Sequence, residues 1–274
     1  MKAMDTVIPA RPVKGFGAFA IAALLAALVL LPISSAVAQL KQDGEGIVKS
    51  VVDGDTLVFA DGREVRLVGI QAPKLPLGRR GFKAWPLAED SKKALEKLSL
   101  GKRLTLSYGG RRMDRHGRLL AHLHSDAKLW VQGALLSQGM ARVYSFADNR
   151  AVIAEMLALE GKARAAKRGI WAEPFYRVLD AEQIERRTKG FQLVEGKVLK
   201  VAPTRRRTYL NFGRDWKRDF TIVIEARNRR AFPERGKRLR RLEGKRVRVR
   251  GWLKWRNGPM VTITHPEQIE MLGK

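Results

Sequence analysis

The sequence contains no cysteine and is poor in acidic residues. Among its 274 residues there are four His, and 27 Asp and Glu stand against 54 Lys and Arg. The missing thiols exclude disulfide bonds, thiolate metal sites and a cysteine nucleophile. The shortage of acid leaves a formal net charge of +27 at pH 7. This charge argues against an ordinary neutral metabolic enzyme and for a polyanionic partner: nucleic acid, an anionic membrane surface or an acidic polysaccharide.

The N-terminal region of the sequence predicts export. Basic residues precede an apolar block at 15–31, and small residues ending in Ala38 follow it. This order is typical of a secretory signal peptide, residues 1–38, cleaved after Ala38. The alternative is an uncleaved membrane anchor, although the block is at the short end for spanning a bilayer. We expect a periplasmic or secreted protein whose mature form does not span a membrane.

The hydrophobic pattern of residues 39–173 predicts a mainly β, α+β domain. Short segments of alternating polarity, separated by turn sequences such as Asp-Gly, predict strands near 45–59, 64–70, 103–108 and 119–124. Helical spacing occurs over 87–98, 130–138 and 151–167. A few short strands with three helices favour a small barrel.

A second strand-rich region follows a linker at 174–190. Strands are expected over 191–202, 208–212, 220–225, 245–255 and 260–264, with a short helix near 235–241. This order is compatible with a small OB-like β-barrel domain at 191–274. Residues 190–274 hold 23 Lys and Arg against eight Asp and Glu, so over half of the excess charge lies in the last third of the chain.

Five motifs in the first region carry a family resemblance. They are Asp53-Gly54-Asp55-Thr56, the run from Arg66 to Pro73, the run from Asp114 to Arg118, Gln138-Gly139-Met140-Ala141 and Arg168-Gly169-Ile170-Trp171. In this order and at these spacings, residues 44–173 resemble the staphylococcal nuclease (thermonuclease) family. The resemblance implies a five-stranded OB-type barrel with three helices.

The resemblance also assigns catalytic roles, because in that family the barrel hydrolyses DNA and RNA phosphodiesters with one calcium ion. Asp55 stands where the family has its first metal carboxylate. The second falls at the amide Gln71, followed by the backbone carbonyl of Ala72, and the water-activating carboxylate falls at Lys74. A lysine is ordinarily protonated at neutral pH, so it cannot accept a proton from water, and its charge opposes cation binding. We therefore expect a weak or absent Ca²⁺ site and hydrolysis that is lost or strongly reduced.

The phosphate-binding part of the family's site is retained at Arg66 and Arg118. A guanidinium presents a rigid bidentate fork to phosphate oxygens, so this pair is expected to clamp a phosphodiester. Arg115 and His116, in the turn before Arg118, are expected to add nucleic-acid contacts. The expected partner is DNA or RNA, single-stranded, with no small-molecule cofactor.

The second domain offers another expected nucleic-acid surface. Period-two alternation places Arg246, Arg248, Arg250 and Trp252 on one strand face. Cations beside an aromatic ring suit a single-strand-binding groove, although a solvated basic face is the simpler alternative. The run 205–207, three arginines, is expected at a loop tip, where it contributes charge rather than a site.

Three hypotheses follow from the sequence. The first is an exported nucleic-acid-binding protein on a nuclease-like scaffold with impaired chemistry. The second is a working nuclease that uses altered metal ligands. The third is a cell-envelope protein whose basic surface binds acidic glycans or lipid headgroups. Strong salt dependence is expected of all binding to polyanions, so only competition between ligands separates the first from the third.

Overall fold

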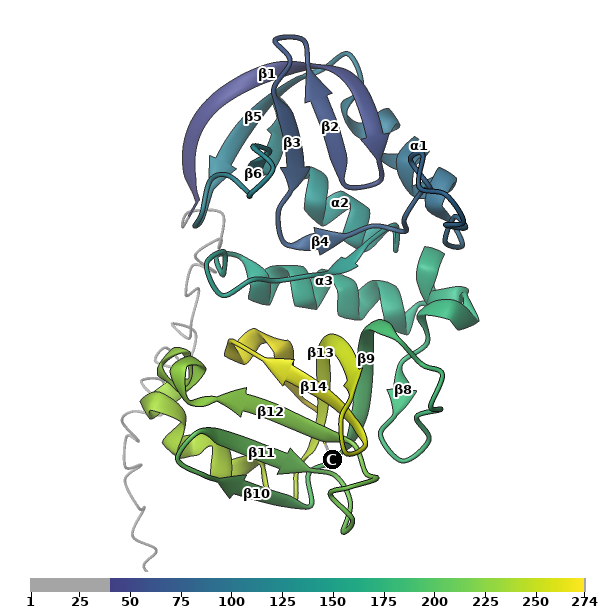
Figure 1. Ribbon diagram of the computed structural model, residues 1–274. Helices are drawn as coiled ribbons and strands as arrows, with labels where there is room; N and C mark the ends of the chain where they lie inside the picture. The colour runs from purple at the N-terminus through teal and green to yellow at the C-terminus, as the bar shows by residue number, and fades with distance from the viewer. Residues whose placement is uncertain (1–39, 274) are drawn as a thin grey trace, which may run out of the picture. The chain divides into compact units, whose positions relative to one another are not determined.

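The computed structural model describes residues 40–273 (Figure 1). The predicted signal peptide at 1–38 lies outside the described residues. No helix between residues 40 and 273 is long and apolar enough to span a bilayer.

The first domain is a closed five-stranded barrel, which confirms the expected fold. Its strands follow the order β1 (Lys41–Asp53), β2 (Thr56–Phe59), β3 (Glu64–Leu67), β6 (Leu119–Ser125) and β5 (Arg103–Tyr108). The β1–β2 turn requires Gly54, because a Cβ there would lie 2.1 Å from the hydroxyl of Ser91. This close approach brings the acidic turn onto the first helix of the domain.

Three helices form where the sequence predicts them: α1 (Ala88–Ser99), α2 (Val131–Ser137) and α3 (Ile153–Ala165). Helices α1 and α2 lie against the barrel, and α3 packs on α2 (Figure 1). An unexpected two-stranded ladder joins β4 (Ile70–Gln71) to β7 (Arg142–Val143). This ladder places Gln71 directly opposite Arg142, a pairing that matters for the site below.

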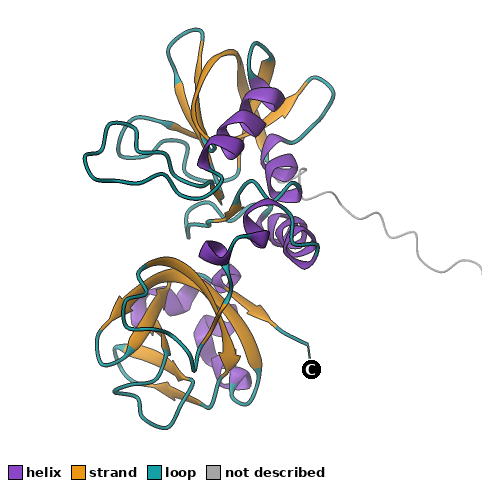
Figure 2. Ribbon diagram, turned by 90° about the vertical axis from the view of Figure 1, so that its right-hand side faces the viewer, coloured by secondary structure: helices purple, strands orange, loops and turns teal. Residues whose placement is uncertain are grey.

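The second domain is an eight-stranded sheet that is separate from the barrel (Figure 2). In chain order its strands are β8 (Leu179–Asp180), β9 (Gly190–Lys197), β10 (Lys200–Pro203), β11 (Arg207–Asn211), β12 (Thr221–Glu225), β13 (Arg246–Trp255), β14 (Pro259–Ile263) and β15 (Ile269–Met271). The expected strand at 191–202 is interrupted into β9 and β10, and β8 lies within the segment expected to be a linker. The domain is rich in strands as expected, and its OB-like assignment stays a prediction.

The connections of the second domain are 3₁₀ turns rather than a regular α-helix. η4 (Ala226–Ala231) and η5 (Pro233–Leu242) link β12 to β13, where a short helix is expected, and η6 (Pro266–Gln268) precedes β15. Phe220, Ile222, Val247 and Val249 belong to a second buried cluster, distinct from the core of the barrel. Each domain therefore has its own apolar core.

Candidate nucleic-acid interface

A lysine side chain pairs with the carboxylates of the acidic turn between β1 and β2. Asp55 is fully buried, and both of its carboxylate oxygens accept hydrogen bonds from Lys74 Nζ at 2.8 Å. The Ala72 N–H donates to Asp55 Oδ2 at 2.6 Å, and Arg66 Nη1 lies 3.2 Å from Oδ1. Burial alone would raise the pKa of Asp55, but the charges of Arg66 and Lys74 outweigh it and lower the pKa to about 2.

A second buried carboxylate, Asp53, belongs to the same cluster. Its Oδ2 lies 3.3 Å from Lys74 Nζ, and its Oδ1 accepts the Asp55 N–H at 3.1 Å. Burial, followed by the nearby Asp55 charge, raises the pKa of Asp53. Sequence reasoning missed this residue, although its place two residues before Asp55 in the acidic turn is the signal that finds it.

Gln71 is bound by another cation from the protein. Its Oε1 accepts hydrogen bonds from Arg142 Nη2 at 2.7 Å and from Arg142 Nε at 3.0 Å. Both side chains are buried, and burial lowers the pKa of Arg142 to about 10. The antiparallel β4–β7 ladder sets this contact. The amide oxygen that the sequence offers as a metal ligand is therefore already in use.

These residues do not fit a calcium ion. Ca²⁺ takes six to eight oxygen ligands, whereas Asp55 is surrounded by an ammonium, a guanidinium and a backbone N–H. Ala72 turns its N–H toward Asp55. Between residues 40 and 273 no group of three or more His, Asp or Glu side chains is arranged to hold a metal. The charge of Lys74, whose Nζ lies 2.8 Å from both oxygens of Asp55, repels a cation from this carboxylate.

The two expected phosphate-binding arginines line one pocket of about 470 Å³, together with Arg115 and His116. The structure thus brings all four predicted residues together. Arg66 donates to the carbonyls of Leu67 and Ile70, both at 2.8 Å. These bonds fix its guanidinium and engage both of its terminal nitrogens.

Arg118 is oriented by a carboxylate on its own turn. Its Nε and Nη2 lie 2.8 Å and 2.7 Å from Asp114 Oδ2. Asp114 also accepts the backbone N–H groups of His116 and Arg118, so the whole turn is pre-formed. The guanidinium of Arg118 stays partly exposed on the pocket wall.

Sequence reasoning missed other residues of this pocket, notably Arg111, Tyr144 and Phe146. The rings of Tyr144 and Phe146 meet edge to face, with centroids 4.9 Å apart. They add aromatic surface beside the arginines. The signal available in the sequence was their i, i+2 spacing just after the Gln138-Gly139-Met140-Ala141 motif.

Residues 64–173 match the family model described as staphylococcal nuclease homologue. An uncharacterized endonuclease of Escherichia coli O157:H7 is 31% identical over 134 residues, which are 48% of this chain and 79% of the relative. The chain belongs to the staphylococcal nuclease homologue family. Endonuclease YncB of Bacillus subtilis (strain 168) is 33% identical over 130 residues, 46% of this chain and 60% of the relative. Protein ParB of Escherichia coli is 34% identical over 164 residues, 56% of this chain and 83% of the relative.

Strand β13 of the second domain contacts the barrel domain, and this contact changes the interpretation of its basic residues. Arg250, expected on an exposed binding face, is only 1% exposed. It donates to both carboxylate oxygens of the buried Glu160 in α3, at 2.8 and 3.0 Å, and to Glu270 at 2.6 Å. Burial alone would raise the pKa of Glu160, but the charge and hydrogen bonds of Arg250, the charge of Arg164 and the Val143 N–H together outweigh it and lower the pKa. The prediction that Arg250 binds nucleic acid is corrected: Arg250 joins the two domains.

The other three residues of that expected surface differ among themselves. Arg248 is largely buried and paired with Glu195 at 2.5 Å and with Glu270 at 3.3 Å. Arg246 is exposed. Trp252 is 50% exposed, and its Nε1 donates to the hydroxyl of Tyr144 at 2.9 Å, so it lies beside the barrel pocket. The alternation along β13 is real, but all three of its arginines have a carboxylate nearby: Arg248 and Arg250 are closely paired, and exposed Arg246 lies 3.9 Å from Glu195.

Proposed function

We propose that this protein is an exported nucleic-acid-binding member of the nuclease family whose calcium-dependent phosphodiester hydrolysis is lost or strongly reduced. The observation that carries the proposal is the Lys74 ammonium, 2.8 Å from each oxygen of Asp55. A protonated lysine cannot take a proton from water, and here its charge occupies the surroundings of the one carboxylate that the family's metal would need.

The pocket supports binding. Arg66, Arg111, Arg115 and Arg118 line it, and Tyr144 provides an aromatic wall. Guanidinium groups bind phosphate oxygens through charge-assisted, paired hydrogen bonds. Rings beside a basic groove stack on unpaired bases. These features favour binding of a single strand whose phosphate backbone lies in this pocket.

Export rests on the amino-terminal sequence, where basic residues, an apolar block and small residues ending at Ala38 are typical of a cleaved signal peptide. We propose a periplasmic or secreted location. Detection of the mature N-terminus at Gln39 in a periplasmic or culture-supernatant fraction tests this point.

A cleavage assay tests the proposed loss of hydrolysis. End-labelled single-stranded DNA is incubated with the protein and millimolar Ca²⁺, and binding is measured on the same sample. We expect the oligonucleotide to be bound and to stay intact. The double variant Gln71→Asp with Lys74→Glu should gain cleavage. Lys93→Glu, which makes the charge change of Lys74→Glu at an exposed position of α1, is the control and should not. Efficient calcium-dependent cleavage by the unmodified protein, abolished in Asp55→Ala, would contradict the proposal.

An active nuclease with altered metal ligands is a second candidate, favoured by the relatives named as endonucleases. The cleavage assay repeated with Mg²⁺, Mn²⁺ and Zn²⁺ addresses it: activity that requires one of these ions and Asp55 supports this candidate.

Binding to acidic glycans or lipid headgroups is the remaining alternative. It predicts that an acidic glycan, or vesicles with anionic lipids, displaces the oligonucleotide at an equal concentration of charge.

A further inference from the structure

The C-terminal domain has an open basic groove that does not include the paired arginines of β13. We define the basic groove by Arg205, Arg206, Arg207, Tyr209, Trp216 and Arg256, which come from the β10–β11 turn, β11, the β11–β12 connection and the β13–β14 turn. We infer that the basic groove is a second binding site, for the phosphates and bases of single-stranded nucleic acid. This inference rests on the proposed function, because it takes the ligand to be nucleic acid.

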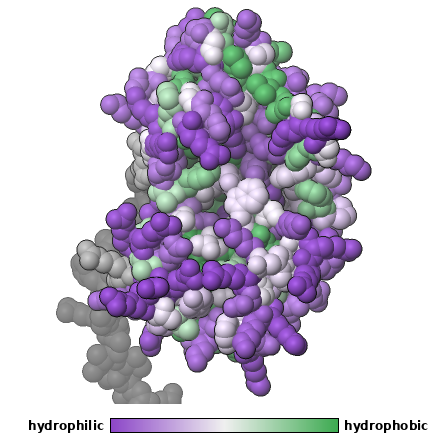
Figure 3. All heavy atoms as spheres, in the orientation of Figure 1, coloured by the Kyte–Doolittle hydropathy of each residue, from purple (hydrophilic) through white to green (hydrophobic). Residues whose placement is uncertain are grey.

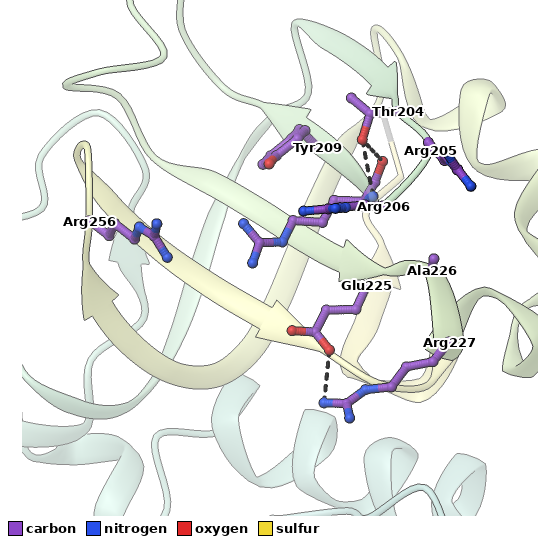
Figure 4. A pocket seen from close by; sticks show the side chains of 9 residues that line it. Thr204, Arg205, Arg206, Tyr209, Glu225, Ala226, Arg227 and Arg256 are labelled. Atoms are coloured by element: carbon purple, nitrogen blue, oxygen red, sulfur yellow. Dashed lines mark hydrogen bonds and ion pairs between the residues drawn. The ribbon is translucent and has the colours of Figure 1, made fainter.

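Two adjoining hollows make up the groove. One, of about 1050 Å³, contains the three successive arginines, Tyr209 and Arg256; the other, of about 450 Å³, shares Arg207, Tyr209 and Arg256 with it and adds Trp216. Figure 4 shows the first hollow, with arginines reaching it from separate segments of the sheet. The two hollows are adjacent, because the shared residues line both, and together they cover β11 and β12.

The charge of the groove is uncompensated. Within the described part of the chain, the side chains of Arg205, Arg206, Arg207 and Arg256 form no hydrogen bond or ion pair. The lining includes one acid, Glu225, and it is paired with Arg227 at 2.8 Å. Hydrophilic side chains also dominate the visible face of this domain in Figure 3. Four unpaired guanidinium groups in one hollow repel one another, and a polyanion relieves that repulsion.

The arginines are held by a fixed backbone rather than by a loose tip. The Thr204 hydroxyl accepts the Arg207 N–H at 3.0 Å and donates to the Arg207 carbonyl at 2.9 Å. The Arg206 carbonyl accepts the Ala226 N–H at 2.9 Å, which ties the turn to the end of β12. The site is therefore pre-formed, and binding orders only the arginine side chains.

Aromatic rings select the ligand class. Tyr209 lines both hollows, and Trp216, which is 55% exposed, lines the second. Cations that meet phosphates beside rings that stack on bases are the recurring design of single-strand sites. A duplex hides its base faces, and a lipid surface or an acidic glycan has no bases to stack.

The test is oligonucleotide binding by groove and control variants of the full protein. Fluorescence anisotropy is measured with a labelled oligothymidylate of about 20 nucleotides, long enough for one such domain. The groove variant is Arg205→Ser/Arg206→Ser/Arg256→Ser. The control, Arg240→Ser/Arg241→Ser/Lys245→Ser, removes three exposed cations of the same domain outside the groove. Unchanged melting temperatures establish that both are folded.

We expect the groove variant to bind at least about tenfold more weakly, with a salt slope reduced by about two, and the control to change by less than about twofold. Trp216→Ala should weaken oligonucleotide binding and leave heparin binding unchanged.

Equal weakening by the groove and control variants overturns the inference, as does a groove variant that loses heparin binding and keeps the oligonucleotide. If the unmodified protein binds no oligonucleotide, the proposed function fails as well. If Arg66→Ser/Arg118→Ser weakens binding and the groove variant does not, the inference alone fails.

Discussion

The second domain contains two arginine-rich surfaces that differ in their supply of acid. On β13, Arg248 and Arg250 are paired with Glu195, Glu160 and Glu270. In the basic groove, four arginines have no carboxylate partner among the described residues. Both surfaces are runs of arginine in the sequence. Where the fold brings acids to such a run, the arginines are neutralised and largely buried, and where it brings none, their charge stays available to a polyanion.

The barrel pocket repeats this contrast on a smaller scale. Beside the pocket, Lys74 and Arg66 neutralise the carboxylate of Asp55, and Arg142 holds the uncharged amide of Gln71. The pocket itself, lined by Arg66, Arg115 and Arg118, has a volume of about 470 Å³ that admits a ligand.

The largest effect is expected from breaking the β13 pairing. Arg250→Ala leaves Glu160 buried without its main partner, and the loss of one member of a buried ion pair costs about 3–5 kcal/mol. Urea unfolding measures this change in the free energy of unfolding. Arg246→Ala, an exposed arginine on the same strand, should change it by less than about 0.5 kcal/mol. Equal effects of the two substitutions would show that the pairing does not distinguish these positions.

A smaller effect is expected from acidification of the same contact region. His265 is buried, its Nε2 lies 2.7 Å from the Ser145 hydroxyl of the barrel domain, and burial lowers its pKa to about 4. The imidazole of His265 is therefore protonated at a higher pH in the unfolded chain than in the folded chain. Its contribution to stability is therefore complete above about pH 6.5 and falls by about 3 kcal/mol as the pH drops to 4. The non-titrating His265→Gln should show a flatter pH dependence of unfolding between pH 6.5 and 4; a slope equal to that of the unmodified protein would contradict this assignment.

The smallest effect compares two neighbouring cations on one hairpin. Arg256 lines the basic groove, whereas Lys254, two residues earlier and also exposed, does not. Arg256→Ala should weaken oligonucleotide binding by about 1 kcal/mol, and Lys254→Ala by clearly less. Anisotropy titrations at matched salt measure both. A larger loss for Lys254→Ala would move the binding surface away from the groove.

The local parts of this fold were predictable from the sequence. The helix expected at 87–98 forms at Ala88–Ser99, and the strand at 103–108 forms as expected, because periodicity within a segment reports which of its faces is buried. Asp55, Arg66 and Arg118 were found through motifs whose turns are local. The closed barrel followed from the same patterns together with the family resemblance.

The remaining features depend on distant partners. Alternation along β13 predicts which side Arg250 faces, but not that Glu160, 90 residues earlier, covers that side. The Gln71–Arg142 contact comes from a ladder of two residues per strand, too short to leave a pattern. The three arginines at 205–207, expected at a loop tip without a site, gain their meaning from Arg256 and Trp216, which only the folded sheet brings beside them.

We propose that Lys74 takes the place of a metal cation beside Asp55, and calcium titration calorimetry tests this claim most directly. The unmodified protein should give no binding isotherm up to millimolar Ca²⁺, whereas Gln71→Asp/Lys74→Glu, which restores oxygen ligands, should give one. Stoichiometric binding of Ca²⁺ to the unmodified protein, lost in Asp55→Ala, would contradict the claim.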